Sequence, residues 1–287
     1  MIAVLKHELS GYFHSLTAYI FSAFLLAFVG IGALIYNIQS AVANFEYVLG
    51  YVYLGFVVII PILTMRVIAE ERKQKTDQLL YSLPIRTSQI VVGKYLALLV
   101  VYLVPLCIVA LYPLIFAQFG EVYLLTSYGS LFAFFVMGAA MIAVGTFISS
   151  LTENQGFAAG IAIPVILLNY YSVTLAEYVS ATASGSAAAL IVIAVLLGLL
   201  IRHLTKNQNL AYGISLLIML AVAVLFFTDS SKFEGLLPDI MTKLSLFERF
   251  YTFVNGVFDL TALIYYATVI IFFLFLSVQS LEKRRYN

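Results

Sequence analysis

Long apolar runs dominate the chain, and short polar segments separate them. A helix that crosses a bilayer needs about 20 predominantly apolar residues, and eight segments meet this requirement. They are residues 16–36, 47–65, 95–116, 124–151, 157–175, 183–201, 210–227 and 260–278. The pattern therefore predicts an all-α fold, a polytopic transmembrane helical bundle, with residues 1–287 forming one transmembrane domain.

The most polar connecting segment, residues 69–94, lies between the second and third predicted spans. No Gly or Pro interrupts residues 69–81, where charged first turns precede Leu79 and Leu80, so the pattern predicts a helix. Pro84 would end it, and Ser88 would cap the next helix. We expect a short helix outside the membrane that is stiffly joined to a span on each side. The pattern alone equally permits a solvated loop that only fixes the topology.

Two further segments have the pattern of amphipathic helices. In residues 1–15, charged positions such as Lys6 and Glu8 alternate with Val4, Leu5 and Leu9. This alternation predicts a helix that lies at the membrane interface before the first span. In residues 228–259, apolar residues recur at helical spacing between charged ones. Here we expect one or two helices that rest on the opposite face of the bilayer or dip into it.

The distribution of Lys and Arg predicts the orientation. If the N-terminus is cytosolic, the inner segments hold twelve of the fifteen basic residues and the outer segments hold three, Lys232, Lys243 and Arg249. Cytosolic loops of membrane proteins carry such an excess of positive charge. We therefore expect both termini and segment 69–94 in the cytosol, and segment 228–259 outside it. The expected location is the plasma (cytoplasmic) membrane.

Composition excludes several classes of protein. The chain has 63% hydrophobic and only 10% charged residues, whereas soluble domains have about 25% charged residues. Its mean hydropathy is +1.05. A net charge of +1 offers no basic surface for nucleic acid. The single Cys107 lies in an apolar run, which leaves neither a disulfide nor a thiolate metal site.

Catalytic and cofactor chemistry is absent from the sequence pattern. Gly93-Lys94 looks like the end of a phosphate-binding loop, but Tyr95 replaces the Ser or Thr that such a loop requires. His7, His14 and His203 are not clustered with other metal-binding residues. We therefore expect no catalytic residue, no directly bound cofactor and no metal. The protein is not expected to be an enzyme, and an intramembrane hydrolase is a remote alternative.

The predicted spans carry no charged group at their centres, which argues against an ion or proton relay. Asn169, Tyr170 and Tyr171 form a candidate substrate path, with interfacial aromatic anchoring as the alternative. Small residues allow close contact between helices, either within one subunit or between two. These small residues are Gly138, Ala139, Ala140, Gly145, Gly156 and Gly160.

Segment 69–94 resembles the cytosolic coupling loop of type-2 ABC exporter permeases. The matching residues are Glu70, Glu71, Arg72, Thr76, Leu79, Leu80, Pro84, Ile90, Val91, Gly93 and Lys94. Lys75 stands where Gly is commonest in that family, and Gln78 where Glu is commonest. Residues 5–20 and the C-terminal region around Phe250, Gly256, Asp259, Tyr265, Leu281 and Arg284 are similar to permeases of the gliding-motility and nitrous-oxide-accessory type. Residues 182–227 are additional to the usual six-span plan of these permeases.

The resemblance implies a membrane-spanning subunit of an ABC exporter, in which ATP is hydrolysed by a separate cytosolic ATPase. The residues expected to dock on that ATPase are Glu70, Glu71, Arg72, Lys73, Thr76, Asp77, Leu79 and Leu80. The implied partners are a dimer of ATPase subunits, a second or homologous permease, membrane lipid and an extracytoplasmic accessory subunit. The uncharged spans favour an amphipathic cargo. An alternative is a membrane anchor that transmits force to extracytoplasmic partners without moving a solute.

Overall fold

The structure, a computed structural model, describes residues 1–76, 85–205 and 207–285, and these residues form helices and turns without a strand. The chain divides into two compact units. Unit 1 comprises Met1–Tyr170 with Arg249–Asn287, and unit 2 comprises Tyr171–Glu248. The all-helical fold predicted from the sequence is therefore confirmed for the described residues.

Seven helices among the described residues are long and apolar enough to cross a membrane. They correspond to seven of the eight predicted spans. The remaining predicted span, residues 183–201, also forms a helix. By the same criterion it is a shorter apolar segment, Ala183–Leu199. The polytopic helical bundle is thus confirmed, while the number of eight crossings stays a prediction.

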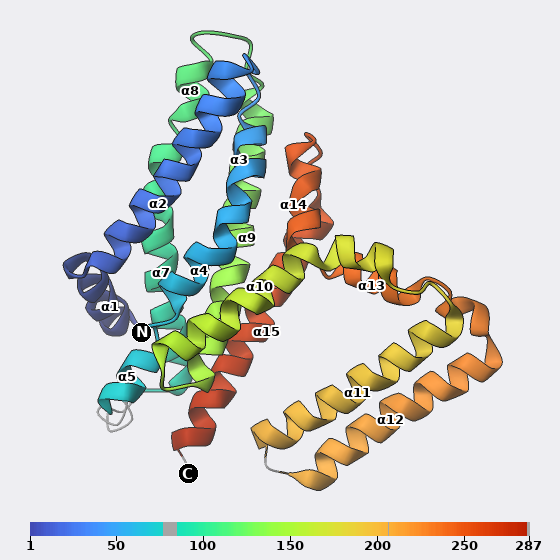
Figure 1. The fold of residues 1–287 in the computed structure, drawn as a ribbon. Helices are drawn as coiled ribbons and strands as arrows, with labels where there is room; N and C mark the ends of the chain where they lie inside the picture. The colour runs from blue at the N-terminus through green and yellow to red at the C-terminus, as the bar shows by residue number, and fades with distance from the viewer. Residues whose placement is uncertain (77–84, 206, 286–287) are drawn as a thin grey trace. The chain divides into compact units, whose positions relative to one another are not determined.

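Unit 1 contains most of the helices (Figure 1). They are α1 (Ile2–His14), α2 (Leu16–Ala33), η1 (Leu34–Gln39), α3 (Glu46–Val52), η2 (Tyr53–Gly55), α4 (Phe56–Thr64), α5 (Ala69–Gln74), α7 (Thr87–Val109), α8 (Tyr112–Phe116), α9 (Leu124–Leu151) and α15 (Leu260–Arg285). Unit 2 contains α11 (Ala183–Thr205), α12 (Gln208–Thr228), η3 (Ser230–Phe233) and α13 (Leu236–Lys243). The helices α10 (Gln155–Tyr178) and α14 (Leu246–Val254) each begin in one unit and end in the other.

Helix α9 forms the centre of unit 1, and glycines let other helices approach it closely. A Cβ atom at Gly138 would lie 2.5 Å from the hydroxyl oxygen of Tyr102 in α7. A Cβ atom at Gly145 would overlap the side chain of Thr64 in α4. These two glycines therefore pack within one chain. Gly160 in α10, by contrast, has no atom within 4 Å of the position of its Cβ.

A turn follows the second predicted span, residues 47–65. Helix α4 ends at Thr64, residues 65–68 form a turn, and α5 begins at Ala69. The backbone N–H groups of Ile68 and Ala69 both donate to the hydroxyl oxygen of Ser149 in α9, each at 3.2 Å. Ser149 is fully buried. Because its hydroxyl satisfies N–H groups that begin the new helix, α9 fixes the place where α5 starts.

Helix α5 is shorter than the sequence pattern predicted. It ends at Gln74 because Lys75 adopts the left-handed conformation, with φ 57° and ψ 21°. The prediction of one uninterrupted helix over residues 69–81 is therefore wrong at Lys75. Residues 77–84, with Asp77, Leu79, Leu80 and Pro84, lie outside the described residues.

The start of α7 also differs from the prediction. Its first residue is Thr87 and its N-cap is Arg86, so Ser88 lies inside the helix and does not cap it. The side-chain oxygen of Gln89 accepts a hydrogen bond from the Arg86 N–H at 3.4 Å. Gln89 thus supplies the reciprocal half of a capping interaction that the prediction assigned to Ser88.

Of the one or two amphipathic helices expected in residues 228–259, two are present, α13 and α14. The part of α14 in unit 1 packs on protein with its apolar side, and its position at the bilayer face stays a prediction. Phe250 and Phe253 are buried, and the Phe250 ring centroid lies 5.7 Å from that of Phe134 in α9. The hydroxyl of Ser130 donates to the Phe253 carbonyl at 2.8 Å.

The two ends of the chain lie at one end of unit 1 (Figure 1). Hydrogen bonds join Tyr102 to Phe134 and, further along α7, Ala110 to Tyr128 at the start of α9. Helices α7 and α9 therefore run antiparallel. The start of α7, against which α1 packs, is therefore level with the turn after α9. Arg284, near the end of α15, is bonded to Glu153 in that turn.

Unit 2 is a helical hairpin whose entry and exit adjoin each other. Helices α11 and α12 lie side by side and antiparallel (Figure 1), and Gly198 of α11 faces Ser215 of α12. The backbone N–H of Gly235, after the hairpin, donates to the carbonyl of Ala181, before it, at 2.8 Å. The chain therefore leaves this hairpin where it entered.

Candidate functional site: the charged cluster around Lys94

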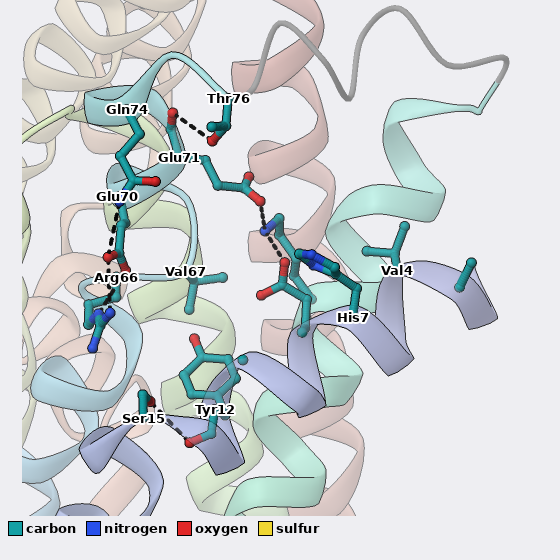
Figure 2. A pocket seen from close by; sticks show the side chains of 14 residues that line it. Val4, His7, Tyr12, Ser15, Arg66, Val67, Glu70, Glu71, Gln74 and Thr76 are labelled. Carbon is teal, nitrogen blue, oxygen red and sulfur yellow. Dashed lines mark hydrogen bonds and ion pairs between the residues drawn. The ribbon is translucent and has the colours of Figure 1, made fainter.

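The buried ammonium group of Lys94 joins three helices of unit 1. Only 1% of its side chain is exposed, yet it lies at the start of a span. Its Nζ atom is 2.6 Å from Oε1 of Glu8 in α1 and 2.6 Å from Oε1 of Glu71 in α5. Figure 2 shows the Glu71 side chain extended toward this contact. A buried ammonium is tolerated only with such partners, so α1, α5 and α7 are fixed to one another here.

A second ion pair fixes the beginning of α5. The guanidinium of Arg66 binds both oxygens of Glu70, with Nε 2.7 Å from Oε2 and Nη2 2.9 Å from Oε1. Its Nη1 atom donates to the hydroxyl of Thr17 in α2 at 2.6 Å. Two-point binding of this kind fixes direction as well as distance. The first turn of α5 is thereby connected to α2.

Gly93 lets α1 pack directly on α7. A Cβ atom there would lie 3.1 Å from the Val4 Cβ and 3.3 Å from the Met1 carbonyl oxygen. These distances are tighter than ordinary van der Waals contact. The Gly93-Lys94 pair therefore has a packing explanation, because the glycine admits α1 and the lysine binds it through Glu8. These contacts with α1 account for the Gly93-Lys94 pair without a role in binding phosphate.

A cavity of about 730 Å³ lies beside these ion pairs. It is lined by Ala3, Val4, His7, Glu8, Gly11, Tyr12, Ser15, Arg66, Val67, Glu70, Glu71, Gln74, Thr76 and Lys94. In Figure 2 Tyr12 and Ser15 lie at one end of the group of lining side chains, and Glu71 and Thr76 lie toward the other end. Burial raises the pKa of the Tyr12 hydroxyl well above its ordinary value, so this residue stays neutral.

The residues predicted to dock on a partner occupy different surroundings. Glu70 and Glu71 are engaged in the ion pairs described above, and Arg72 is buried. Lys73 is exposed. The N–H of Thr76 donates to the Glu71 carbonyl at 3.0 Å and closes the end of α5. The predicted contributions of Asp77, Leu79 and Leu80 fall outside the described residues.

Sequence reasoning did not identify Glu8, Arg66 and Lys94 as members of this cluster. Glu8 and Lys94 are 86 positions apart, and Glu71 and Lys94 are 23 apart. Periodicity within one helix cannot pair residues at such separations. The available signal was the position of Arg66 and Lys94 at the edges of apolar spans, where an isolated charge requires a partner.

The three residues of the predicted substrate path lie in one turn of α10. Asn169, Tyr170 and Tyr171 are consecutive residues of α10, so their side chains project in different directions. The Tyr170 ring centroid lies 5.8 Å from that of Tyr53, and none of the three residues lines the cavity described above. Their role in a path stays a prediction.

Further charges lie at the same end of unit 1. Arg284 hydrogen-bonds Glu153 and thereby lowers the pKa of that exposed carboxyl below its ordinary value. The positive charges of Arg72 and Lys75 lower this pKa further. The turn after α9 and the end of α5 are therefore electrostatic neighbours.

Comparison with known proteins adds a family relationship. A family model described as ABC-2 family transporter protein matches residues 30–228, which is well over half of the chain. The match includes segment 69–94 and continues through residues 182–227, the region set apart from the usual six-span plan above. No curated protein matches the chain.

Proposed function

Because the chain belongs to the ABC-2 family of transporter proteins, we propose that it is an exporter permease powered by a separate cytosolic ATPase. Family membership and the apolar helices make it a multi-pass membrane protein and a permease component of an ABC transporter. Export, and coupling to an ATPase that docks on segment 69–94, are our proposals.

The observation that carries the coupling proposal is the double ion pair of Lys94. A partner that moves α5 also displaces Glu71, and through Lys94 it displaces the start of α7 and the helix α1. Glu70 transmits the same movement to Arg66 and Thr17. The sequence pattern predicted that a continuous helix would supply this stiffness. Because α5 ends at Gln74, we assign the stiffness to the ion pairs instead.

In this proposal Glu70, Glu71, Arg72 and Thr76 position the docking segment, and Lys73 contacts the ATPase. Arg72 is buried and both carboxylates are engaged within the chain, so none of these three groups is fully available to a partner. Asp77, Leu79 and Leu80 remain proposed contacts. ATP is bound and hydrolysed by the partner, and the permease itself binds no cofactor.

The working assembly that we propose has two ATPase subunits and two permeases in the plasma membrane, the second permease being a copy or a homologue. Its subtype is nearest the gliding-motility and nitrous-oxide-accessory permeases, which makes an extracytoplasmic accessory subunit a further partner. Both termini are cytosolic, α1 lies at the inner membrane interface, and α11 and α12 complete eight crossings. The cargo is an amphipathic molecule.

The test is ATP hydrolysis by the full-length chain assembled with an ABC ATPase subunit in lipid nanodiscs. Glu71→Lys places a second cation beside Lys94, so we expect the complex to lose most of its substrate-stimulated hydrolysis. Glu121→Lys is the matched control, since it makes the same change at an exposed residue before α9. Stimulated hydrolysis at the wild-type level in the assembled Glu71→Lys complex would contradict the coupling proposal.

A further inference from the structure

The cavity beside Lys94 has the size and the lining of a ligand site. Its volume of about 730 Å³ lies within the range of small-molecule sites, roughly 300 to 1,000 Å³. The lining comes from residues 3–15, from residues 66–76 and from Lys94, all of them described residues of unit 1. Helices α1 and α5 are therefore joined by ion pairs at one place and leave room for a ligand beside it.

The hydroxyl of Tyr12 lines this cavity without a partner from the chain. Tyr12 is only 7% exposed, and its hydroxyl hydrogen-bonds no described residue, since Ser15 bonds its backbone carbonyl instead. In Figure 2 this hydroxyl points toward Val67. Burial raises its pKa well above the ordinary value, so it stays protonated and can donate a hydrogen bond. A buried donor without an acceptor is costly, and a ligand with an acceptor oxygen removes that cost.

Glu8 offers an acceptor to the same cavity. Its Oε1 atom binds the Lys94 ammonium, whereas no residue in the described ranges bonds its Oε2 atom. The charged side chains of the lining are three carboxylates and two cations, which with neutral histidine leave a net charge of −1. The lining therefore favours a ligand that brings a positively charged hydrogen-bond donor.

The cavity also adjoins apolar surface of the kind that faces lipid. Ile2 and Leu16, the neighbours in sequence of the first and last lining residues of segment 3–15, are 65% and 75% exposed. Ala3, Val4 and Val67 make part of the lining itself apolar. A molecule with a charged head and an apolar tail satisfies both surroundings.

From these groups we infer that the cavity binds the headgroup of a phospholipid that carries a primary amine, such as phosphatidylethanolamine. Its ammonium group donates to Oε2 of Glu8, and a phosphate oxygen accepts from the hydroxyl of Tyr12. The inference adds a lipid site to the proposed function, and it rests on the placement of α1 at the inner membrane interface.

The chemistry of the lining selects among headgroups. A zwitterionic headgroup suits a lining that carries both signs of charge. The quaternary ammonium of choline has no N–H to donate to Glu8, and a glycerol headgroup brings a negative charge to a lining that is already negative. Phosphatidylethanolamine should therefore bind more tightly than phosphatidylcholine or phosphatidylglycerol.

The first test compares these three lipids on the unchanged protein. The full-length chain is delipidated in detergent, and native mass spectrometry measures the binding of lipids that have identical acyl chains. We expect one site that binds phosphatidylethanolamine about tenfold more tightly than the other two, as one charge-assisted hydrogen bond implies. Equal affinities for the three lipids, or tighter binding of phosphatidylglycerol, would overturn the inference.

A soluble competitor distinguishes a lipid from a free headgroup. Glycerophosphoethanolamine carries the same charges without acyl chains, and it should displace the lipid only at a much higher concentration, because burial of the chains adds affinity. Displacement at an equal concentration would mean that the cavity takes a soluble molecule, and it would overturn the assignment to lipid.

The second test locates the site. Tyr12→Phe removes the hydroxyl and keeps the ring, so it should weaken phosphatidylethanolamine binding about tenfold. The lipid-free variant should melt at the wild-type temperature, because the hydroxyl bonds no described part of the chain. Tyr19→Phe, the same change at an exposed tyrosine of α2, should bind as the wild type does. Wild-type affinity in the Tyr12→Phe variant would contradict this location.

The lipid measurements use the chain without an ATPase, so the two proposals fail separately. Selective lipid binding by a chain that does not alter the hydrolysis of an ABC ATPase would refute the proposed coupling alone. Equal binding of the three lipids by a chain that does couple to an ATPase would refute only the lipid site.

Discussion

Lys75 ends α5 in a left-handed conformation that is unfavourable for any residue with a side chain. At φ 57° its Cβ atom crowds the backbone, which costs roughly 1 to 2 kcal/mol. Glycine avoids this cost, and glycine is the commonest residue here in the permeases that segment 69–94 resembles. The position thus requires a backbone conformation that ends the helix, and this chain meets the requirement with lysine.

We therefore predict that Lys75→Gly stabilises the protein by about 0.5 to 1 kcal/mol, the relieved strain less the greater backbone entropy of glycine. Lys73→Gly is the matched control, because Lys73 lies within α5. A glycine inside a helix costs roughly 0.5 to 1 kcal/mol. Thermal unfolding of the detergent-solubilised variants measures both effects. A lower melting temperature for Lys75→Gly would contradict the assignment of strain.

The pairing of Lys94 shows why a buried ion cluster can be retained at a net energetic cost. Removal of an ammonium group from water costs several kcal/mol, and two carboxylates at 2.6 Å offset much of that cost. An apolar residue could pack here without the desolvation. The lysine instead specifies how the helices are arranged, because its two carboxylate partners must come from α1 and α5.

At the scale of helices, α9 determines how α4 and α7 are placed. Its glycines face Thr64 and Tyr102, and its Ser149 hydroxyl begins α5. The small side chains therefore serve the packing of one chain at Gly138 and Gly145. A contact between two subunits stays possible at α10, because no atom of the chain lies within 4 Å of the Cβ position of Gly160.

Gly145→Ala should destabilise the protein by about 2 kcal/mol, because the new methyl group overlaps Thr64 and overpacking costs roughly 1 to 3 kcal/mol. Adding Thr64→Ala removes two of the three overlapping atoms, Oγ1 and Cγ2, and should recover part of the loss. Gly160→Ala, the control, should be neutral or slightly stabilising. Thermal unfolding of the four proteins is the measurement. Equal destabilisation by both glycine substitutions would contradict the assignment of the loss to the contact with Thr64, because helix propensity alone favours alanine over glycine.

Hydropathy predicted the helices but not their interruptions. Apolar length alone located the seven spans, because the cost of burying polar groups in lipid restricts where a span can end. The turn at 65–68 depends on Ser149, about 80 positions away, and no local pattern encodes such a contact. The charges of segment 69–94 identify it in the sequence. Only the structure shows that Glu70 and Glu71 point inward, because their partners are distant in sequence or lie outside the segment.

At the scale of the whole chain, the positions of the ends within each unit limit the number of crossings that we expect. The chain begins and ends at one end of unit 1, where Glu8 contacts Lys94 and Arg284 contacts Glu153. Unit 2 is entered and left at adjacent residues, Ala181 and Gly235. We therefore expect α11 and α12 either both to cross the membrane or both to stay on one side, so that the chain has eight crossings or six.

The turn between α11 and α12 distinguishes these two arrangements. We predict eight crossings, because α12 is apolar enough to span and the sequence between and beside the two helices carries Arg202 and Lys206, as expected of a cytosolic loop. In a Cys107→Ser background, a cysteine at Gln208 should then react with an impermeant thiol reagent only from the cytosolic side. Cysteines at Lys73 and Lys232 calibrate the two sides, with Lys73 cytosolic and Lys232 outside. Labelling of the Gln208 position from the same side as Lys232 would mean that the hairpin does not cross. A C-terminal tag on the opposite side from Lys73 would contradict the placement of both chain ends.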